Sequence, residues 1–421
     1  MTHNESSPRV FRIRSLHILI RCAILFWFCG CATLFAQEKN EPVAGARTET
    51  GMDVLEAQHF AALRGKHVGV ITNQTGVDAL GRRTIDVLAQ AEGLKLVAIF
   101  SPEHGIAARA DAAVANATDS ATGLPIYSLY GATRRPTGAM LQGIDAIVFD
   151  IQDVGVRFYT YVTTMAYGME AAAKHGIAFF VLDRPNPLGG EIIEGPMLDA
   201  GEVSFVGYFP MPVRYAMTMG ELAKMFNAEN KIGAELHVVE MRNWRRNEMY
   251  WMTGLPWIPP SPNLPTLANL VPYPGIEILQ AGGVSVGRGT DSAFLEFGAP
   301  GTEPQELLAE LKRRSMAGVA FEAKSFTPKS GPYAGEKCDG VGLTVTEREG
   351  FRSMSMGMEI AEALHRLYPQ QFQISKMITL LGSQSTVERL ERADDPKAIE
   401  AGWDAELAKF QALRAKYLIY R

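Results

Sequence analysis

The chain has 421 residues, of which 47% are hydrophobic, and carries a formal net charge of -5. A chain of this length accommodates about two domains of ordinary size, each with its own core. The weak negative charge provides no broad basic surface and therefore argues against nucleic acid as a partner. Small polar or sugar-like substrates fit this composition better.

The first 36 residues are typical of an export signal. Four arginines precede an apolar run, Cys22 to Phe28, and a small-residue segment: Arg9, Arg12, Arg14 and Arg21. This order is that of a secretory signal, and the run to Ala36 is shorter than the ~20 residues of a membrane span. We expect residues 1–36 to direct export to the periplasm or cell envelope. Cleavage after Ala36 and lipidation of Cys31 are both open, and an uncleaved anchor is the alternative.

Only one cysteine, Cys338, lies outside this leader. The sequence therefore predicts no disulfide within the folded part and no cysteine-based zinc site. We expect no resident metal and no cofactor.

Residues 37–50 are polar without a period and are predicted to be a linker. Strands and helices should then alternate, because apolar runs alternate with segments of helical spacing. The expected strands are 66–73, 95–100, 146–150, 179–183, 235–241 and 341–347. The expected helices are 84–91, the crossover between the third and fourth strands, 217–227, 304–317, 354–368 and 404–417. Seven prolines between Pro256 and Pro274 should prevent regular structure there.

This alternation predicts an α/β fold with a parallel sheet and a domain boundary near residue 290. Polar side chains follow four of the expected strands, where ligands bind in open α/β sheets. They are Asn73 after the first strand, Glu103 and His104 after the second, Gln152, Asp153, Arg157 and Tyr159 after the third, and Arg184 and Asn186 after the fourth.

Several strings, in order over nearly the whole chain from Gly51, resemble the exo-β-N-acetylmuramidase family. They are GKHVGVITNQTGVD, FSPEHGI, TGLPIYSLYG, VFDIQDVGVRFYTYV, VLDRPNPLGG, EGPML, TGLPWIPPSPNLPTL, YPG and GRGT. The resemblance implies a Rossmann-like catalytic domain, residues 51–290, and a smaller C-terminal α/β domain, residues 291–421. It also implies release of terminal N-acetylmuramic acid from the non-reducing end of peptidoglycan fragments, whose muropeptides or disaccharides would be the partners, in a cleft between the domains.

Glycoside hydrolysis requires a carboxylic acid to protonate the leaving oxygen and usually a second group at the anomeric carbon. Glu103, in a tight Pro-Glu-His-Gly turn, is the best candidate for the acid, although a surface turn or capping role fits the same residue. Glu194 could face the same crevice or be a strand-edge charge. Glu170, in the crossover helix, more simply faces solvent.

An enzyme that selects N-acetylmuramic acid should bind its lactyl carboxylate with a cation. The candidates are Arg157, Arg184 and Arg288. Arg288 stands between Gly287 and Gly289, which could let the backbone approach a ligand. The remaining candidates for substrate binding are His104, Asn73, Asp150, Asp153, Tyr159, Asn186 and Asn263. Asp150 and Asp153 could instead hold a metal, and Asp183 with Arg184 could be an ion pair that pins its turn.

The chain departs from the family pattern in three places. Ala107 and Ala108 replace Arg-Gly, Tyr215 and Ala216 replace His-Gly, and the Gly283 to Val286 segment lacks the usual amide and carboxylate. These differences leave open a non-catalytic muropeptide-binding protein as the alternative function.

Overall fold

The structure, a computed structural model, describes Met1 and residues 45–107, 115–314 and 316–421. The predicted export signal, most of the predicted linker and Ala108 lie outside the described residues. Within the described part, no helix is both long enough and apolar enough to cross a bilayer.

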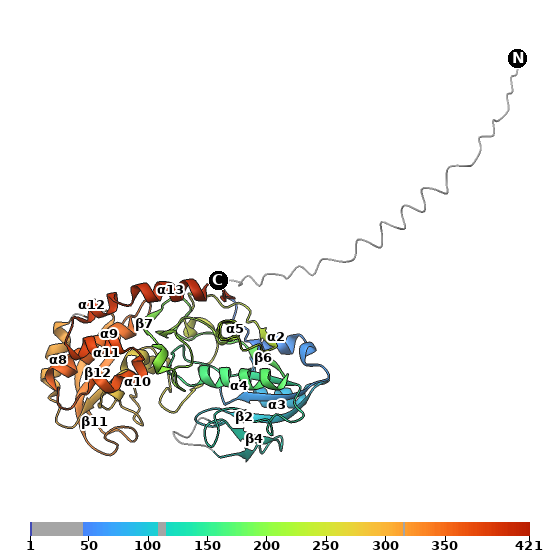
Figure 1. Cartoon of the computed structure of the whole chain (residues 1–421), viewed down its shortest axis with the longest axis horizontal. Helices are drawn as coiled ribbons and strands as arrows, with labels where there is room; N and C mark the ends of the chain where they lie inside the picture. Colours follow the sequence, from blue (N-terminus) through green and yellow to red (C-terminus); the bar gives the residue numbers. More distant parts are fainter. Residues whose placement is uncertain (2–44, 108–114, 315) are drawn as a thin grey trace. The chain divides into compact units, whose positions relative to one another are not determined.

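A seven-stranded sheet forms the N-terminal part of the fold, with strand order β3-β4-β2-β1-β5-β6-β9. Its strands β2, β4 and β6 are labelled in Figure 1. All neighbouring pairs are parallel except β3 with β4. The strands are β1 (His67–Thr72), β2 (Lys95–Ser101), β3 (Ala117–Thr118), β4 (Pro125–Ser128), β5 (Ala146–Asp150), β6 (Ala178–Leu182) and β9 (Leu236–Val239). The predicted parallel α/β sheet is confirmed.

Helices cover both faces of this sheet because its central strands are apolar on both sides. Helices α2 (Gly51–Ala57) and α3 (Thr84–Gln90) pack on the face that carries Val70 and Val148. Helices α4 (Tyr161–His175) and α5 (Met219–Glu229) pack on the opposite face, against Ile147 and Phe149. Thr218 and Glu221 form the capping box predicted at the start of α5.

A second, antiparallel sheet follows, with order β10-β12-β11. Its strands are β10 (Glu296–Ala299), β11 (Val319–Phe326) and β12 (Cys338–Val345). A short antiparallel pair, β7 (Glu194–Met197) and β8 (Pro212–Arg214), lies between the two sheets in the sequence. The helices of this part are α6 (Leu267–Leu270), α7 (Tyr273–Ala281), α8 (Pro304–Arg313), α9 (Ser353–Leu367), α10 (Ile378–Leu381), α11 (Gln384–Glu391), α12 (Pro396–Ala401) and α13 (Asp404–Arg414).

One hydrophobic core runs from the α4 face of the first sheet into the second sheet and α9. Residues Pro42–Arg421 accordingly form a single compact unit. The domain boundary near residue 290 stays a prediction.

The prediction for the proline-rich segment was wrong at its C-terminal end. Helices α6 and α7 form there, and α7 starts at Tyr273 with Pro274 in its first turn. Proline is tolerated at that place because the first backbone N–H groups of a helix have no partner within the helix. Helix α7 contributes Tyr273, Glu277 and Gln280 to the cavity described below.

Candidate active site

The turn after β2 presents Glu103 and His104 to a cavity of about 430 Å³. The Gly105 N–H donates to the Pro102 carbonyl at 3.1 Å and closes the turn. His104 adopts a left-handed backbone conformation, φ 68°, which histidine tolerates better than most residues. The Thr160 hydroxyl donates to Oε2 of Glu103 and fixes the carboxyl group. The volume falls within the range of small-ligand sites.

The cavity is built from distant parts of the chain. From the first sheet and its loops come Glu103, His104, Phe158, Tyr159, Thr160 and Val206; from the later segments come Ser261, Tyr273, Glu277, Gln280, Arg288, Phe294, Ser330, Gly331 and Leu380. The site therefore lies where the carboxyl ends of β2 and β5 meet α7 and the loops around the second sheet. Of the predicted site residues, Glu103, His104, Tyr159 and Arg288 line this cavity.

Two tyrosines, Tyr159 and Tyr273, line the cavity, and Tyr161 packs against Tyr159. The ring of Tyr159 packs edge-on against Tyr161 and Tyr273, with centroid distances of 4.9 and 6.2 Å. Burial raises the pKa of Tyr159 and Tyr273 well above the ordinary value; Tyr161 adds to the effect on Tyr159, and Glu277 adds to the effect on Tyr273. These hydroxyls therefore stay protonated at neutral pH and offer neutral hydrogen-bonding groups around the cavity.

A second carboxylate, Glu277 of α7, lies in the same cavity and forms an ion pair with Arg288. The guanidinium of Arg288 also lies 5.3 Å from the ring centroid of Phe294. Sequence reasoning missed Glu277, Tyr273 and Gln280, because it assigned the start of α7 to an irregular loop. The spacing of Tyr273, Glu277 and Gln280, four and then three residues apart, was the available signal, since such residues share one helix face.

Arg288 lies where the sequence predicted, but its flanking glycines serve another purpose. Both have positive φ. A Cβ at Gly287 would come within 2.6 Å of Glu296, and one at Gly289 within 2.8 Å of Lys329. The glycines therefore let the loop pack against its own neighbours, and a close approach of a ligand to this backbone stays a prediction. Asn263 Oδ1 accepts from the Gly289 N–H at 2.9 Å and fixes the loop.

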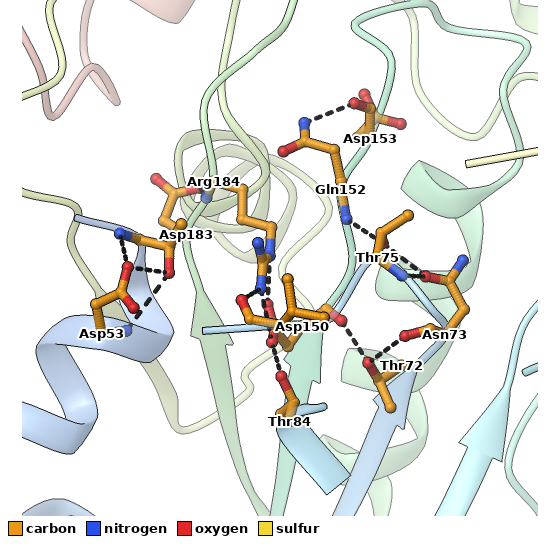
Figure 2. A network of polar contacts seen from close by, with 12 residues as sticks. Asp53, Thr72, Asn73, Thr75, Thr84, Asp150, Gln152, Asp153, Asp183 and Arg184 are labelled. Carbon is orange, nitrogen blue, oxygen red and sulfur yellow. Dashed lines mark hydrogen bonds and ion pairs between the residues drawn. The ribbon is translucent and has the colours of Figure 1, made fainter. Parts of the chain in front are cut away.

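Asp150 and Arg184 bind each other and do not line the cavity (Figure 2). Arg184 donates Nε to Oδ1 at 2.6 Å and one terminal nitrogen to Oδ2 at 3.0 Å, while Thr84 also donates to Oδ2. Asp150 ends β5 and Arg184 follows β6, so this pair joins the carboxyl ends of two neighbouring strands.

The turn that follows β1 is also held by contacts within the protein (Figure 2). Asn73 Oδ1 accepts from the Thr75 N–H at 2.9 Å, and its amide donates to the Tyr161 hydroxyl at 2.9 Å. A Cβ at Gly76 would fall 2.1 Å from the Thr72 hydroxyl and 2.8 Å from the Asp150 carbonyl. Asn73 thus holds the turn and binds Tyr161, whose ring packs against Tyr159.

Asp153 is buried and does not line the cavity. Its Oδ2 accepts from the Gly155 N–H at 2.7 Å and from the Tyr215 hydroxyl. Burial raises its pKa to about 6 against these opposing hydrogen bonds. Because Asp150 is committed to Arg184 and Asp153 to Tyr215, the structure does not support the metal-pair alternative. In the described residues no three acidic, His or Cys side chains gather as metal ligands.

Arg157 is a structural residue in this arrangement. Its guanidinium, 1% exposed, donates to four backbone carbonyls, those of Pro196, Met211, Leu380 and Leu381, at 2.6 to 3.0 Å. Burial lowers its pKa to about 9. The expectation that it faces the substrate is corrected, because its terminal nitrogens tie the end of α10 to the β7–β8 region.

Two more predicted residues lie outside the cavity lining. Glu194 is buried in an ion pair with Arg214, 3.0 Å from Oε2 to Nη1. Burial raises the pKa of Glu194 while Arg214 opposes the shift. Asn186 accepts from the Leu188 N–H at 3.0 Å and donates to the Met217 carbonyl at 2.9 Å. Neither residue is placed to meet a sugar bound beside Glu103.

The departures from the family pattern are accommodated without disturbing the cavity. Tyr215 binds Asp153, and the Ala216 carbonyl accepts from Arg246 and Arg414, each at 2.6 Å. Val286 is buried, and Gly283 has φ 107°. None of these four residues lines the cavity.

Comparisons with known proteins agree with this arrangement. The family models for the N-terminal and C-terminal parts of exo-beta-N-acetylmuramidase NamZ match residues 68–268 and 271–420. The chain belongs to this family. It is 40% identical, over 94% of its length and 97% of the relative's, to the peptidoglycan beta-N-acetylmuramidase NamZ of Bacillus subtilis (strain 168).

Two solved structures of DUF1343 family proteins from Bacteroides fragilis NCTC 9343 share the fold. The first is 39% identical with a TM-score of 0.82, and the second is 30% identical with a TM-score of 0.72. Each comparison covers 89% of this chain and 99% of the other. The NamZ family fold thus extends through both sheets.

Proposed function

We propose that the protein is an exo-acting glycoside hydrolase that releases terminal N-acetylmuramic acid from the non-reducing end of peptidoglycan fragments. Its membership of the NamZ family supports the activity. The single observation that supports the location is the cavity beside Glu103, which holds a fixed carboxyl group, a second carboxylate and a cation in a volume suited to a sugar.

Glu103 is the group that protonates the leaving oxygen. It is held by Thr160 at the end of β2, so its carboxyl group is oriented before substrate enters. An oriented acid avoids the entropic cost of finding its geometry in the transition state. His104, the next residue, lines the same cavity, where it would lie beside a bound sugar.

Arg288 recognises the lactyl carboxylate, and Glu277 orients its guanidinium. The pair is neutral as a whole, so the substrate carboxylate has to share the guanidinium with Glu277. Arginine suits this sharing because its planar group carries five N–H donors. Glycoside hydrolysis usually uses a second group at the anomeric carbon. We assign this role to Glu277 in place of Glu194.

The test is incubation with a chromogenic β-N-acetylmuramide, with and without a chelator. Release of chromophore by the wild type is expected and would exclude a protein that only binds muropeptides. Activity that survives the chelator excludes a metal-dependent hydrolase. Muropeptide binding without release would instead establish the binding protein as the function.

We also propose export to the periplasm or cell envelope. The proposal rests on the order of charged, apolar and small residues in the first 36 positions. Intact-mass analysis of protein made with its own leader should show a start at Gln37 or a lipidated Cys31. An unprocessed Met1 species in the cytoplasm would refute export.

A further inference from the structure

An arginine stacked among aromatic rings lies beside the cavity. The Arg134 guanidinium carbon is 4.2 Å from the ring centroid of Phe205 and 5.9 Å from that of Tyr130. The rings of Tyr130 and Phe205 stack at 6.1 Å, and Tyr167 adds a third ring 6.0 Å from Phe205. We call these four residues, Tyr130, Arg134, Tyr167 and Phe205, the Arg134 patch.

The patch is continuous with the cavity through two elements. Val206, which lines the cavity, directly follows Phe205 in the chain. Thr160, at the start of α4, also lines the cavity, and Tyr167 follows seven residues later. At 1.5 Å per residue, the patch begins about 10 Å along α4 from the cavity wall. A substrate longer than one sugar that leaves the cavity on this side would pass over the patch.

Arg134 and its neighbour Arg135 differ in whether an acidic side chain pairs with them. Arg135 forms an ion pair with Glu170 and lies 3.3 Å from the ring centroid of Tyr167. Arg134 is exposed, and no carboxylate of the described residues pairs with it. A guanidinium stacked on a ring keeps its in-plane N–H donors available and loses little freedom when they bind.

We propose that Arg134 binds a carboxylate on the part of the substrate that lies beyond the scissile bond. This inference rests on the proposed function and extends it to the leaving-group side of the same site. In peptidoglycan such a carboxylate belongs either to the lactyl group of the next N-acetylmuramic acid or to its peptide stem. Arg134 recognises both by the same charge-assisted hydrogen bonds.

The experiment compares kcat/KM of wild type and Arg134→Gln on four substrates. A chromogenic muramide and the disaccharide N-acetylmuramyl-N-acetylglucosamine carry no carboxylate beyond the scissile bond. The corresponding tetrasaccharide carries a free lactyl carboxylate there. In the same tetrasaccharide with a peptide stem on that sugar, the lactyl group is an amide and the carboxylates are those of the stem. The matched control is Arg348→Gln, because Arg348 is also exposed and lies 5.7 Å from the ring centroid of Trp251, outside the cavity lining.

Arg134→Gln should lower kcat/KM about two- to fivefold on the longer substrates, the scale of an exposed ion pair, and leave the two short ones unchanged. A loss only on the tetrasaccharide without the stem assigns the lactyl carboxylate, and a loss only with the stem assigns the peptide. A loss on both shows that Arg134 binds a carboxylate from either source. The proposal is overturned by an equal loss on all four substrates, by no loss on any, or by the same loss in Arg348→Gln. Failure of the proposed function would appear separately, as a wild type that does not cleave the chromogenic muramide.

Discussion

Thr160 donates its hydroxyl hydrogen to Oε2 of Glu103, joining the N-cap of α4 to the turn after β2. The two residues are 57 positions apart in the chain. Because the hydroxyl holds one carboxyl oxygen, the other oxygen is the one that can serve a substrate. This relationship makes the acid role of Glu103 directly testable.

Glu103→Gln should lower turnover of an unactivated disaccharide by about 100-fold or more, because a glutamine amide cannot protonate the leaving oxygen. Its thermal unfolding should match the wild type, since the amide oxygen can still accept from Thr160. The control is Glu92→Gln, an exposed carboxylate before β2, which should retain full turnover. Near-normal turnover in Glu103→Gln would remove Glu103 from the acid role.

Arg288→Ala should erase most of the preference for a muramide over the matching glucosaminide. A charge-assisted hydrogen bond fully made in the transition state corresponds to about 10- to 150-fold in kcat/KM. The loss should fall on the muramide, because the glucosaminide has no lactyl carboxylate. Equal slowing of both sugars would mean that Arg288 only shapes its loop beside Glu277.

Arg184→Met should destabilise the protein by about 3 to 5 kcal/mol, because it leaves Asp150 as a buried charge without its partner. Urea unfolding measures the change. Asp150→Asn should cost a similar amount, because it leaves the buried guanidinium of Arg184 without its counter-charge. A loss below about 1 kcal/mol in Arg184→Met would show that the pair contributes little to stability.

Asp153 should make the wild type less stable as the pH rises from about 4 to 6. Its pKa is about 6 in the folded protein against 3.8 for an ordinary aspartate, so the folded state binds the proton more tightly. The free energy of unfolding therefore falls through this window, by about 3 kcal/mol for a shift of two units. Asp153→Asn should flatten that part of the profile, and an unchanged slope would contradict the assignment.

The parts of the fold that the sequence predicted are those with local signals. The apolar runs of β5 and β6, the crossover α4 and the capping box at Thr218 each depend on residues close together in the chain. The sequence also located Glu103 and Arg288, since each stands in a turn at the end of a regular pattern.

The sequence pattern could not show contacts between residues that are far apart in the chain. Arg184 after a strand end looks the same whether it binds a ligand or Asp150, which is 34 residues away. Arg157 likewise meets carbonyls more than 200 positions further on, at Leu380 and Leu381. Helix α7 was missed because its prolines suggested a loop, and Glu277 was missed with it.

The cavity described above is assembled from residues that span Glu103 to Leu380. Such a site has no local precursor, because its walls come from segments that are far apart in the chain. Contacts between distant positions also slow folding, since a long loop must close before they can form. Recovery of hydrolysis after dilution from denaturant therefore reports completion of the whole fold, and neither half of the chain alone would carry the reaction.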